Sequence, residues 1–347
     1  MSEPTANPYP AGAVSRFVAW VDGLPWHGWW VYPGIVAVLF LWGHGVLWAS
    51  GVLPFGAIDP LIAVGVAYGP FTLAALAYLN GVAARAIAAF WPATGWPEAE
   101  RAAWTYRFVT TPGGYGWWCL VFGVVVAIGA YVGAPPSLPE ARDANRALIP
   151  IAYLPTLLMG YSMLPAALVH AWRQLRLVAR IHREARAIDP FDRGPVYAFS
   201  RLTAQAGLVF LVVAYYSLTV NGSFQAGNLV SLASIGLAIV LGVACFVVPL
   251  WGIHGRLGDE KERLQREVEA RISRLGAEMY ARIDAGQFEA TKTITDTLAG
   301  TVTLRERISR LPTWPWPPQV VSGFISALLL PVIVFLVTRV LSSQIGD

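Results

Sequence analysis

Residues 229–252 read LVSLASIGLAIVLGVACFVVPLWG, and residues 254–284 read HGRLGDEKERLQREVEARISRLGAEMYARID. The first stretch carries no charged residue and is long enough to cross roughly 30 Å of hydrocarbon as a helix. The second is charged throughout and keeps a helical spacing of its apolar residues. This change within a few residues predicts one helix that leaves a membrane and continues into water.

Similar apolar runs recur along the 347-residue chain, in which 56% of residues are hydrophobic and 13% are charged. A soluble domain usually has about 25% charged residues, so the composition excludes an ordinary soluble protein. The runs predict an all-α polytopic membrane protein with about seven transmembrane helices. These cover residues 32–54, 60–81, 115–133, 148–170, 206–221, 229–252 and 319–341.

Basic residues are divided unequally between the two sides of this predicted bundle. The N-terminus and the connections after the second, fourth and sixth spans hold 22 of the 25 Lys and Arg residues. Such residues concentrate on the cytoplasmic side, which predicts a cytoplasmic N-terminus and a C-terminus outside. The excess of Arg over Lys favours a prokaryotic inner membrane as the cell membrane concerned.

The same patterns divide the chain into four regions. Residues 1–31 are predicted to form a cytoplasmic interfacial segment, because apolar residues and tryptophans there share one helical face. Residues 32–252 form a six-helix transmembrane region, in which helices 4 and 5 have extended cytoplasmic ends. Residues 253–318 form a cytoplasmic helical hairpin, and residues 319–347 form the seventh helix and the outer C-terminus.

An apolar stripe runs along the charged helix, because Leu264, Val268 and Ile272 recur eleven residues later as Leu275, Met279 and Ile283. A repeat of eleven suits a nearly straight helix with one packing face. A second helix containing Ile294, Leu298, Leu304, Ile308 and Leu311 is predicted to fold back on it. The stripe packs either on this second helix or on a neighbouring copy, so we expect self-association and a possible protein partner through residues 254–311.

His44 lies near the middle of the first span, between Gly43 and Gly45. An ionisable side chain at that depth is costly and is a candidate for function. The histidine is either a gate, proton relay or cofactor ligand, or a neutral packing residue that shares a hydrogen bond.

The fourth span carries Pro155 and Pro165 in its interior. Interrupted helices expose backbone carbonyl groups, and transporter and channel sites are often built there. Hydroxyl groups on this span and the next form either such a site or a hydrogen-bonded packing interface. The candidate pore or polar intramembrane residues, besides His44, are Tyr153, Tyr161, Ser162, Tyr215, Tyr216, Ser326 and Arg339.

A basic stripe follows the fourth span. Arg173, Arg176, Arg180 and Arg183 are candidates for contact with anionic lipid headgroups, with the acidic start of the 259–269 helix, or with solvent alone. Small residues four apart, such as Gly65 with Gly69 and Gly129 with Gly133, predict close contacts between helices.

The sequence has no P-loop, no zinc-protease motif and no nucleophile elbow, so no enzyme activity, cofactor or metal is predicted. A net charge of +4 is too small to indicate nucleic acid as a partner. A haem held by two of His27, His170 and His254 is a remaining alternative.

The layout is similar to that of insect-type gustatory and odorant receptor channels. Those proteins have seven helices, an inside N-terminus, long cytoplasmic extensions of helices 4 to 6 and a cytoplasmic segment before helix 7. The likeness is one of topology, and no motif residue transfers a pore or ligand site to this chain. We therefore predict a homo-oligomeric channel or sensor-channel in the lipid bilayer. A non-catalytic scaffolding subunit and a haem-binding redox subunit are the alternatives.

Overall fold

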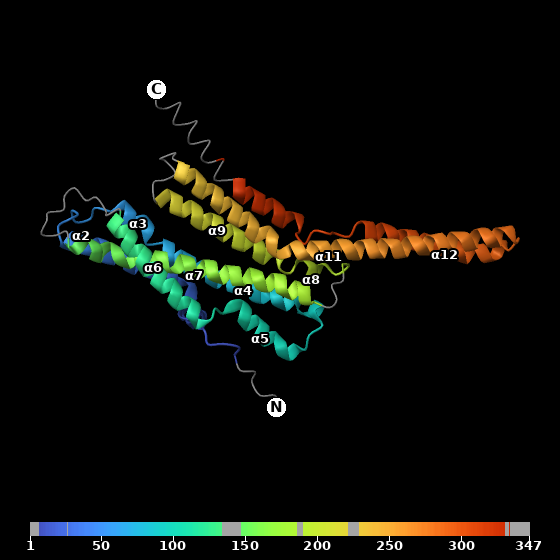
Figure 1. Cartoon of the computed structure of the whole chain (residues 1–347), viewed down its shortest axis with the longest axis horizontal. Coiled ribbons are helices and arrows are strands. Elements are labelled where there is room, and N and C mark those ends of the chain that lie inside the picture. Colours follow the sequence, from blue (N-terminus) through green and yellow to red (C-terminus); the bar gives the residue numbers. More distant parts are fainter. Residues whose placement is uncertain are drawn as a thin grey trace, which may run out of the picture.

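The computed structural model describes residues 7–25, 27–133, 147–185, 190–220, 229–329 and 333. Within these ranges the chain is helical, and its β structure is one isolated antiparallel bridge between Ala11 and Pro112. The elements, shown in Figure 1, are α1 (Ala13–Asp22), η1 (Gly28–Trp30), α2 (Val31–Ala49), α3 (Pro60–Gly65), α4 (Tyr68–Thr94), α5 (Glu98–Val109), α6 (Gly113–Gly133), α7 (Ile149–Glu184), α8 (Arg193–Tyr197), α9 (Ser200–Val220), α11 (Leu229–Asp284) and α12 (Phe288–Ser309).

Among the residues that the structure describes, six helices are long and apolar enough to cross a membrane, so the chain is an all-α multi-pass membrane protein. A shorter apolar helix, Pro318–Leu329, covers the start of the predicted seventh span. The remainder of that span lies outside the described residues. The six helices are Gly28–Ala49, Pro60–Thr94, Gly113–Val132, Ile149–Glu184, Gly194–Val213 and Ile239–Asp284.

The second span differs from its prediction in two ways, because it is interrupted near its start and continues past its predicted end. The chain breaks between α3 and α4, so Pro70 lies in the first turn of a new helix, where its missing N–H costs little. α4 then continues far past residue 81 to Thr94, and Gly95 ends it with a left-handed φ of 66°. The expected connection over residues 82–114 is therefore mostly helix.

Six exposed tryptophans at one end of the apolar helices form what we call the tryptophan belt: Trp20, Trp29, Trp30, Trp117, Trp118 and Trp172. α2 extends from this belt for 19 residues, about 28 Å at 1.5 Å per residue. The distance matches the hydrocarbon thickness of a bilayer, and tryptophans favour the membrane interface. We therefore place the hydrocarbon region between the belt and the far end of α2.

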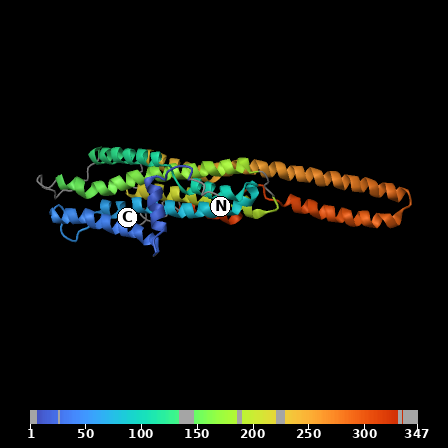
Figure 2. The same cartoon turned by 90° about the horizontal axis from the view of Figure 1, so that it is seen from below.

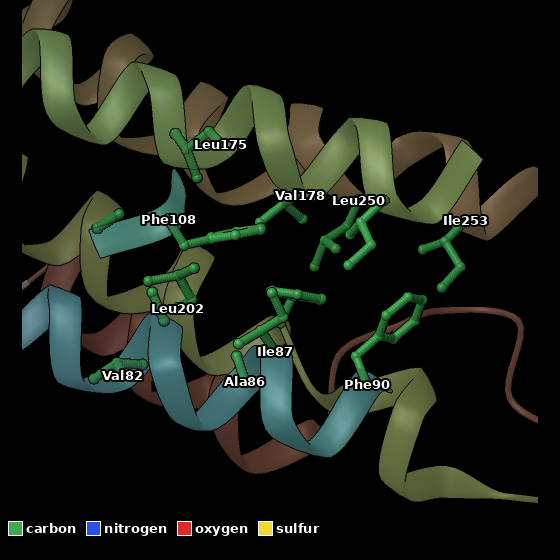
Figure 3. Packing of buried hydrophobic residues seen from close by; sticks show 14 of the residues in the cluster. Val82, Ala86, Ile87, Phe90, Phe108, Leu175, Val178, Leu202, Leu250 and Ile253 are labelled. Atoms are coloured by element: carbon green, nitrogen blue, oxygen red, sulfur yellow. The ribbon is translucent and has the colours of Figure 1, made fainter. Parts of the chain in front are cut away.

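The largest apolar core lies mostly beyond the belt, in what we call the extramembrane layer, and continues between α9 and α11 into the membrane part. The layer is built from the second half of α4, from α5 and α8, and from the parts of α7, α9 and α11 nearest the hairpin. Figure 3 shows Ile87 and Phe90 of α4 facing Val178 of α7, with Leu250 and Ile253 of α11 closing the space. Trp104 and Phe108 are 5% and 0% exposed within this core.

α11 runs without interruption for 56 residues from Leu229 to Asp284, about 84 Å. Gly286, with a φ of 73°, turns the chain, and α12 returns along α11, as the pattern predicted. Figure 1 and Figure 2 both show these two helices projecting together beyond the bundle. Val268 meets Ile308 and Leu311 near the base of this hairpin, whereas Leu304, expected on the packing face, is exposed.

Two groups of helices make up the membrane part. α2, α3, α4 and α6 gather around α7, while α9 pairs with α11. Figure 1 shows that α9 and α11 diverge from α6 and α7 with distance from the hairpin. The extramembrane layer joins the two groups, because both contribute to its core.

Candidate functional site

A cavity of about 300 Å³ lies where α3, α4, α7 and α9 meet. Most of its polar groups are hydroxyls, and they come from helices of both groups. We call it the tyrosine cavity. The residues that define it are Tyr68, Tyr153, Thr156, Gly160, Tyr161 and Tyr216. Its volume is at the lower end of the range for small-molecule sites.

Two hydroxyls of the tyrosine cavity are unpaired. Tyr153 and Thr156 are buried, and neither hydroxyl has a hydrogen-bond partner among the described residues. The carboxylate of Asp59 lies near the Tyr153 hydroxyl, but the contact does not meet the geometry of a hydrogen bond. A buried polar group left unpaired costs roughly 1–3 kcal/mol. A molecule that pairs with these hydroxyls would recover part of that cost.

Tyr216 closes one side of the cavity. Its hydroxyl donates to the carbonyl oxygen of Val64 in α3, and its ring stacks on Tyr68 of α4 with 5.5 Å between the ring centroids. The break between α3 and α4 lies between these two contacts. Tyr216 therefore connects α9 to this break.

His44 lies outside this cavity and is fully buried, at 0% exposure. The backbone N–H of Asp59 donates to its Nε2 over 3.0 Å, which requires Nε2 to be unprotonated. Its Nδ1 then carries the hydrogen and donates to the carbonyl oxygen of Phe40 over 3.0 Å. Asp59 in turn caps α3 by accepting from the N–H of Ile62. This arrangement holds a neutral histidine and ties α2 to the start of α3.

The prolines of α7 do not interrupt the helix, which continues through Pro155 and Pro165. Because proline has no N–H, Pro155 leaves the carbonyl oxygen of Ile151 without its donor four residues along. The indole N–H of Trp42 donates to that oxygen over 2.9 Å. A side chain of α2 thus satisfies the carbonyl that the proline exposes.

His170 is the centre of a buried polar network near the belt. Its Nε2 donates to Asn80 Oδ1, and Thr111 donates its hydroxyl to Nδ1, each over 2.6 Å. Gln174 donates to Asn80 Oδ1 and to the carbonyl oxygen of Phe108. A cavity of about 20 Å³ adjoins the network, enough for about one water molecule. Both ring nitrogens are engaged, so His170 has no free nitrogen for a haem iron.

The other two histidines considered for haem lie in different settings. His27 is exposed before η1. His254 donates from Nδ1 to the carbonyl oxygen of Thr313 over 2.8 Å, and its ring lies against Trp314 with 4.1 Å between centroids. The contacts of His254 join α11 to the segment that follows α12.

The predicted arginine stripe is present along the last turns of α7, but its members have different contacts. Arg173 donates to the Tyr9 hydroxyl over 3.0 Å. Burial raises the pKa of Tyr9 and the guanidinium opposes that shift. Arg176 lies over the ring of Trp172, and Arg180 pairs with Glu184. Arg183 is exposed. Arg173 therefore fixes the N-terminal arm, and the other three face outward.

The remaining predicted residues are not brought together. Ser162 faces α6, where a Cβ added to Gly123 would lie 2.6 Å from Ser162 Cα. Tyr215 packs against the part of the largest apolar core that continues into the membrane part, and Ser326 is exposed on the Pro318–Leu329 helix. Arg339 lies outside the described residues. Of the predicted set, Tyr153, Tyr161 and Tyr216 meet in the tyrosine cavity.

Sequence reasoning missed Asp59, Tyr68, Asn80 and Gln174. Asn80 did give a signal, because it interrupts the apolar run LAYLNGV of the second span. Asp59 precedes Pro60, which is a common pattern at a helix start. Tyr68 and Gln174 gave no signal that separates them from ordinary interfacial residues.

The chain matches no family model, no curated protein and no solved structure.

Proposed function

We propose that this multi-pass membrane protein is a homo-oligomeric sensor-channel, in which occupancy of the tyrosine cavity controls the position of α9 and α11. The observation that carries the proposal is the cavity itself. It joins hydroxyls from both helix groups and leaves those of Tyr153 and Thr156 unpaired. A small uncharged molecule with a hydrogen-bonding group fits such a site.

Continuity of α11 supports a sensing role. The helix pairs with α9 in the membrane part and extends to the tip of the hairpin. Gly207 and Gly242 let the two backbones approach closely, since a Cβ on Gly207 would lie 2.7 Å from the Gly242 carbonyl oxygen. A shift of α9 at Tyr216 would thus move α11 with it. The distribution of basic residues favours a cytoplasmic position for the hairpin, which is part of the proposal.

The Pro318–Leu329 helix supports the channel part of the proposal. Phe324 packs on Phe246 of α11, while Ser322, Ile325, Ser326 and Leu329 are exposed. Ser322 and Ser326 are four residues apart and share a helical face. In a ring of subunits this face would bring hydroxyls to a shared path.

Ion flux from liposomes that contain the full-length protein tests the proposal. We expect K⁺ or Cl⁻ flux that Ser326→Leu reduces. Tyr216→Phe should change the flux by about two- to tenfold, the effect of one hydrogen bond of about 0.5–1.5 kcal/mol. Tyr280→Phe, on the exposed hairpin, is the matched control. Well-folded protein without flux of either ion, or a monomeric native mass, would count against the proposal.

A scaffolding role remains the second candidate because the hairpin tip exposes Tyr280 and Phe288, each 66% exposed. The double variant Tyr280→Ser and Phe288→Ser should then release a bound partner protein without changing thermal stability. Unchanged partner binding by that variant would remove the tip as a docking surface.

A further inference from the structure

A second cavity, of about 610 Å³, lies between α4 and the segment made of α1, η1 and α2. We call it the lateral groove. Its walls are mainly apolar and include Val36, Ala67, Phe71 and Ala74. Asp22, Trp29, Tyr32 and Tyr78 provide its polar and aromatic groups.

Polar and apolar groups lie at opposite ends of the groove, as they do in a lipid molecule. Asp22, Trp29 and Tyr32 lie at the level of the tryptophan belt, because α2 begins at Val31 directly after it. Val36 lies about one helical turn deeper, and Ala67 and Phe71 belong to the α4 end farthest from the hairpin. The groove thus has a polar end at the interface and an apolar end in the hydrocarbon region.

Two polar groups at the interfacial end lack partners. Asp22 is exposed and forms no ion pair within the ranges that the structure describes. Tyr32 is only 6% exposed, and its buried hydroxyl has no partner there. Asp22 at the end of α1 and Tyr32 at the start of α2 both line the groove. Together they offer one site for a cation and one donor for an oxygen.

The chemistry of this end matches an ammonium group. A carboxylate accepts charge-assisted hydrogen bonds from a primary ammonium, and the ring faces of tryptophan and tyrosine attract cations. The unpaired Tyr32 hydroxyl can donate to a phosphate or ester oxygen beside that ammonium. A headgroup that ends in a primary ammonium and carries a phosphate satisfies both groups, and its acyl chain covers the apolar walls.

We infer that the lateral groove binds a phospholipid with a primary-ammonium headgroup, of the phosphatidylethanolamine type. The ammonium pairs with Asp22 between the aromatic rings, the Tyr32 hydroxyl donates to a headgroup oxygen, and one acyl chain lies along Val36 and Phe71. This site is separate from the tyrosine cavity and does not depend on the proposed channel activity.

Native mass spectrometry of the full-length protein in mild detergent tests the inference. Phosphatidylethanolamine, phosphatidylcholine and phosphatidylglycerol with identical acyl chains are added in turn, and the bound fraction is measured. We expect phosphatidylethanolamine to bind about tenfold more tightly than phosphatidylglycerol, the effect of one charge-assisted contact. Asp22→Asn should abolish this preference and Tyr32→Phe should reduce it. Asp296→Asn, on the exposed face of α12, is the matched control and should keep it.

A second variant tests the contribution of the apolar walls independently of the headgroup contact. Ala74→Leu narrows the apolar walls without touching a charged group and should weaken binding of the lipid while the protein keeps its elution volume. Equal binding of phosphatidylethanolamine and phosphatidylglycerol to the wild type, or a preference that survives Asp22→Asn, would overturn the inference. Phosphatidylcholine bound as well as phosphatidylethanolamine would overturn the assignment of a primary ammonium.

Discussion

Replacing His44 tests whether this buried histidine serves packing or chemistry. His44→Leu keeps most of the volume but removes the acceptor for the N–H of Asp59. Asp59 is 8% exposed, so its unpaired N–H would cost roughly 1–3 kcal/mol. Loosening Asp59 also weakens the cap of α3, which contributes about 1 kcal/mol. We therefore expect a loss of about 2–4 kcal/mol.

His44→Gln is the matched variant. The side-chain oxygen of glutamine reaches the position of Nε2 and can accept from the Asp59 N–H, so most of the stability should return. With an unfolding entropy of about 2.1 cal/mol/K per residue, His44→Leu should lower the apparent Tm by roughly 3–6 °C and His44→Gln by about 1 °C. Tryptophan fluorescence of protein in detergent measures both. Wild-type stability in both variants, together with loss of ion flux, would refute the hydrogen-bonding argument and identify a chemical role.

Three further predictions concern other parts of the fold. Gly123→Ala should destabilise the protein by about 1–3 kcal/mol in thermal unfolding, because its Cβ would overlap the backbone of α7, whereas Gly129→Ala, with nothing within 4 Å, should be neutral. Val268→Asp places a carboxylate in the α11–α12 contact and should make the hairpin more sensitive to limited proteolysis. Val302→Asp, on the exposed face of α12, is the control, and equal cleavage rates in the two variants would contradict the packing. Burial raises the pKa of Asp22, and the bound ammonium requires an ionised carboxylate. Lipid binding should therefore weaken as the pH falls through this raised pKa and be independent of pH in Asp22→Asn; a pH dependence that persists in the variant would contradict this.

Apolar run length predicted six helices that the structure contains, and apolar spacing predicted that α12 returns along α11, because both patterns depend on residues close in sequence. The extension of α4 to Thr94 was not predictable in this way. Residues 82–94 follow a run that is already long enough to span and contain Arg85 and Pro92, so the pattern does not extend the helix over them. Their helix is stabilised by packing on α7, α9 and α11. A helix outside the membrane gains stability mainly from such tertiary contacts.

For polar contacts in the membrane part, the sequence identifies the group that needs a partner but does not identify the partner. Pro155 identifies the carbonyl oxygen of Ile151 as lacking a donor, since the offset of four residues is fixed. That Trp42 supplies the donor depends on how α2 packs on α7. Likewise, the sequence marks His44 as costly, but its partner Asp59 lies in a loop whose path follows no periodicity. The tyrosine cavity likewise depends on how α3, α4 and α9 pack against α7, and the sequence pattern does not determine that packing.

Different forces stabilise the membrane part and the extramembrane layer. In hydrocarbon, apolar side chains gain little from packing together, so close backbone contacts and hydrogen bonds fix the helices. Gly69 against Met159 and Gly123 against Ser162 are contacts of this kind. In the extramembrane layer the hydrophobic effect operates fully, and most of the largest core lies there. We therefore expect the helices to diverge or close around the tyrosine cavity while α11 pivots about its contacts in the extramembrane layer, so that the hairpin moves with α11.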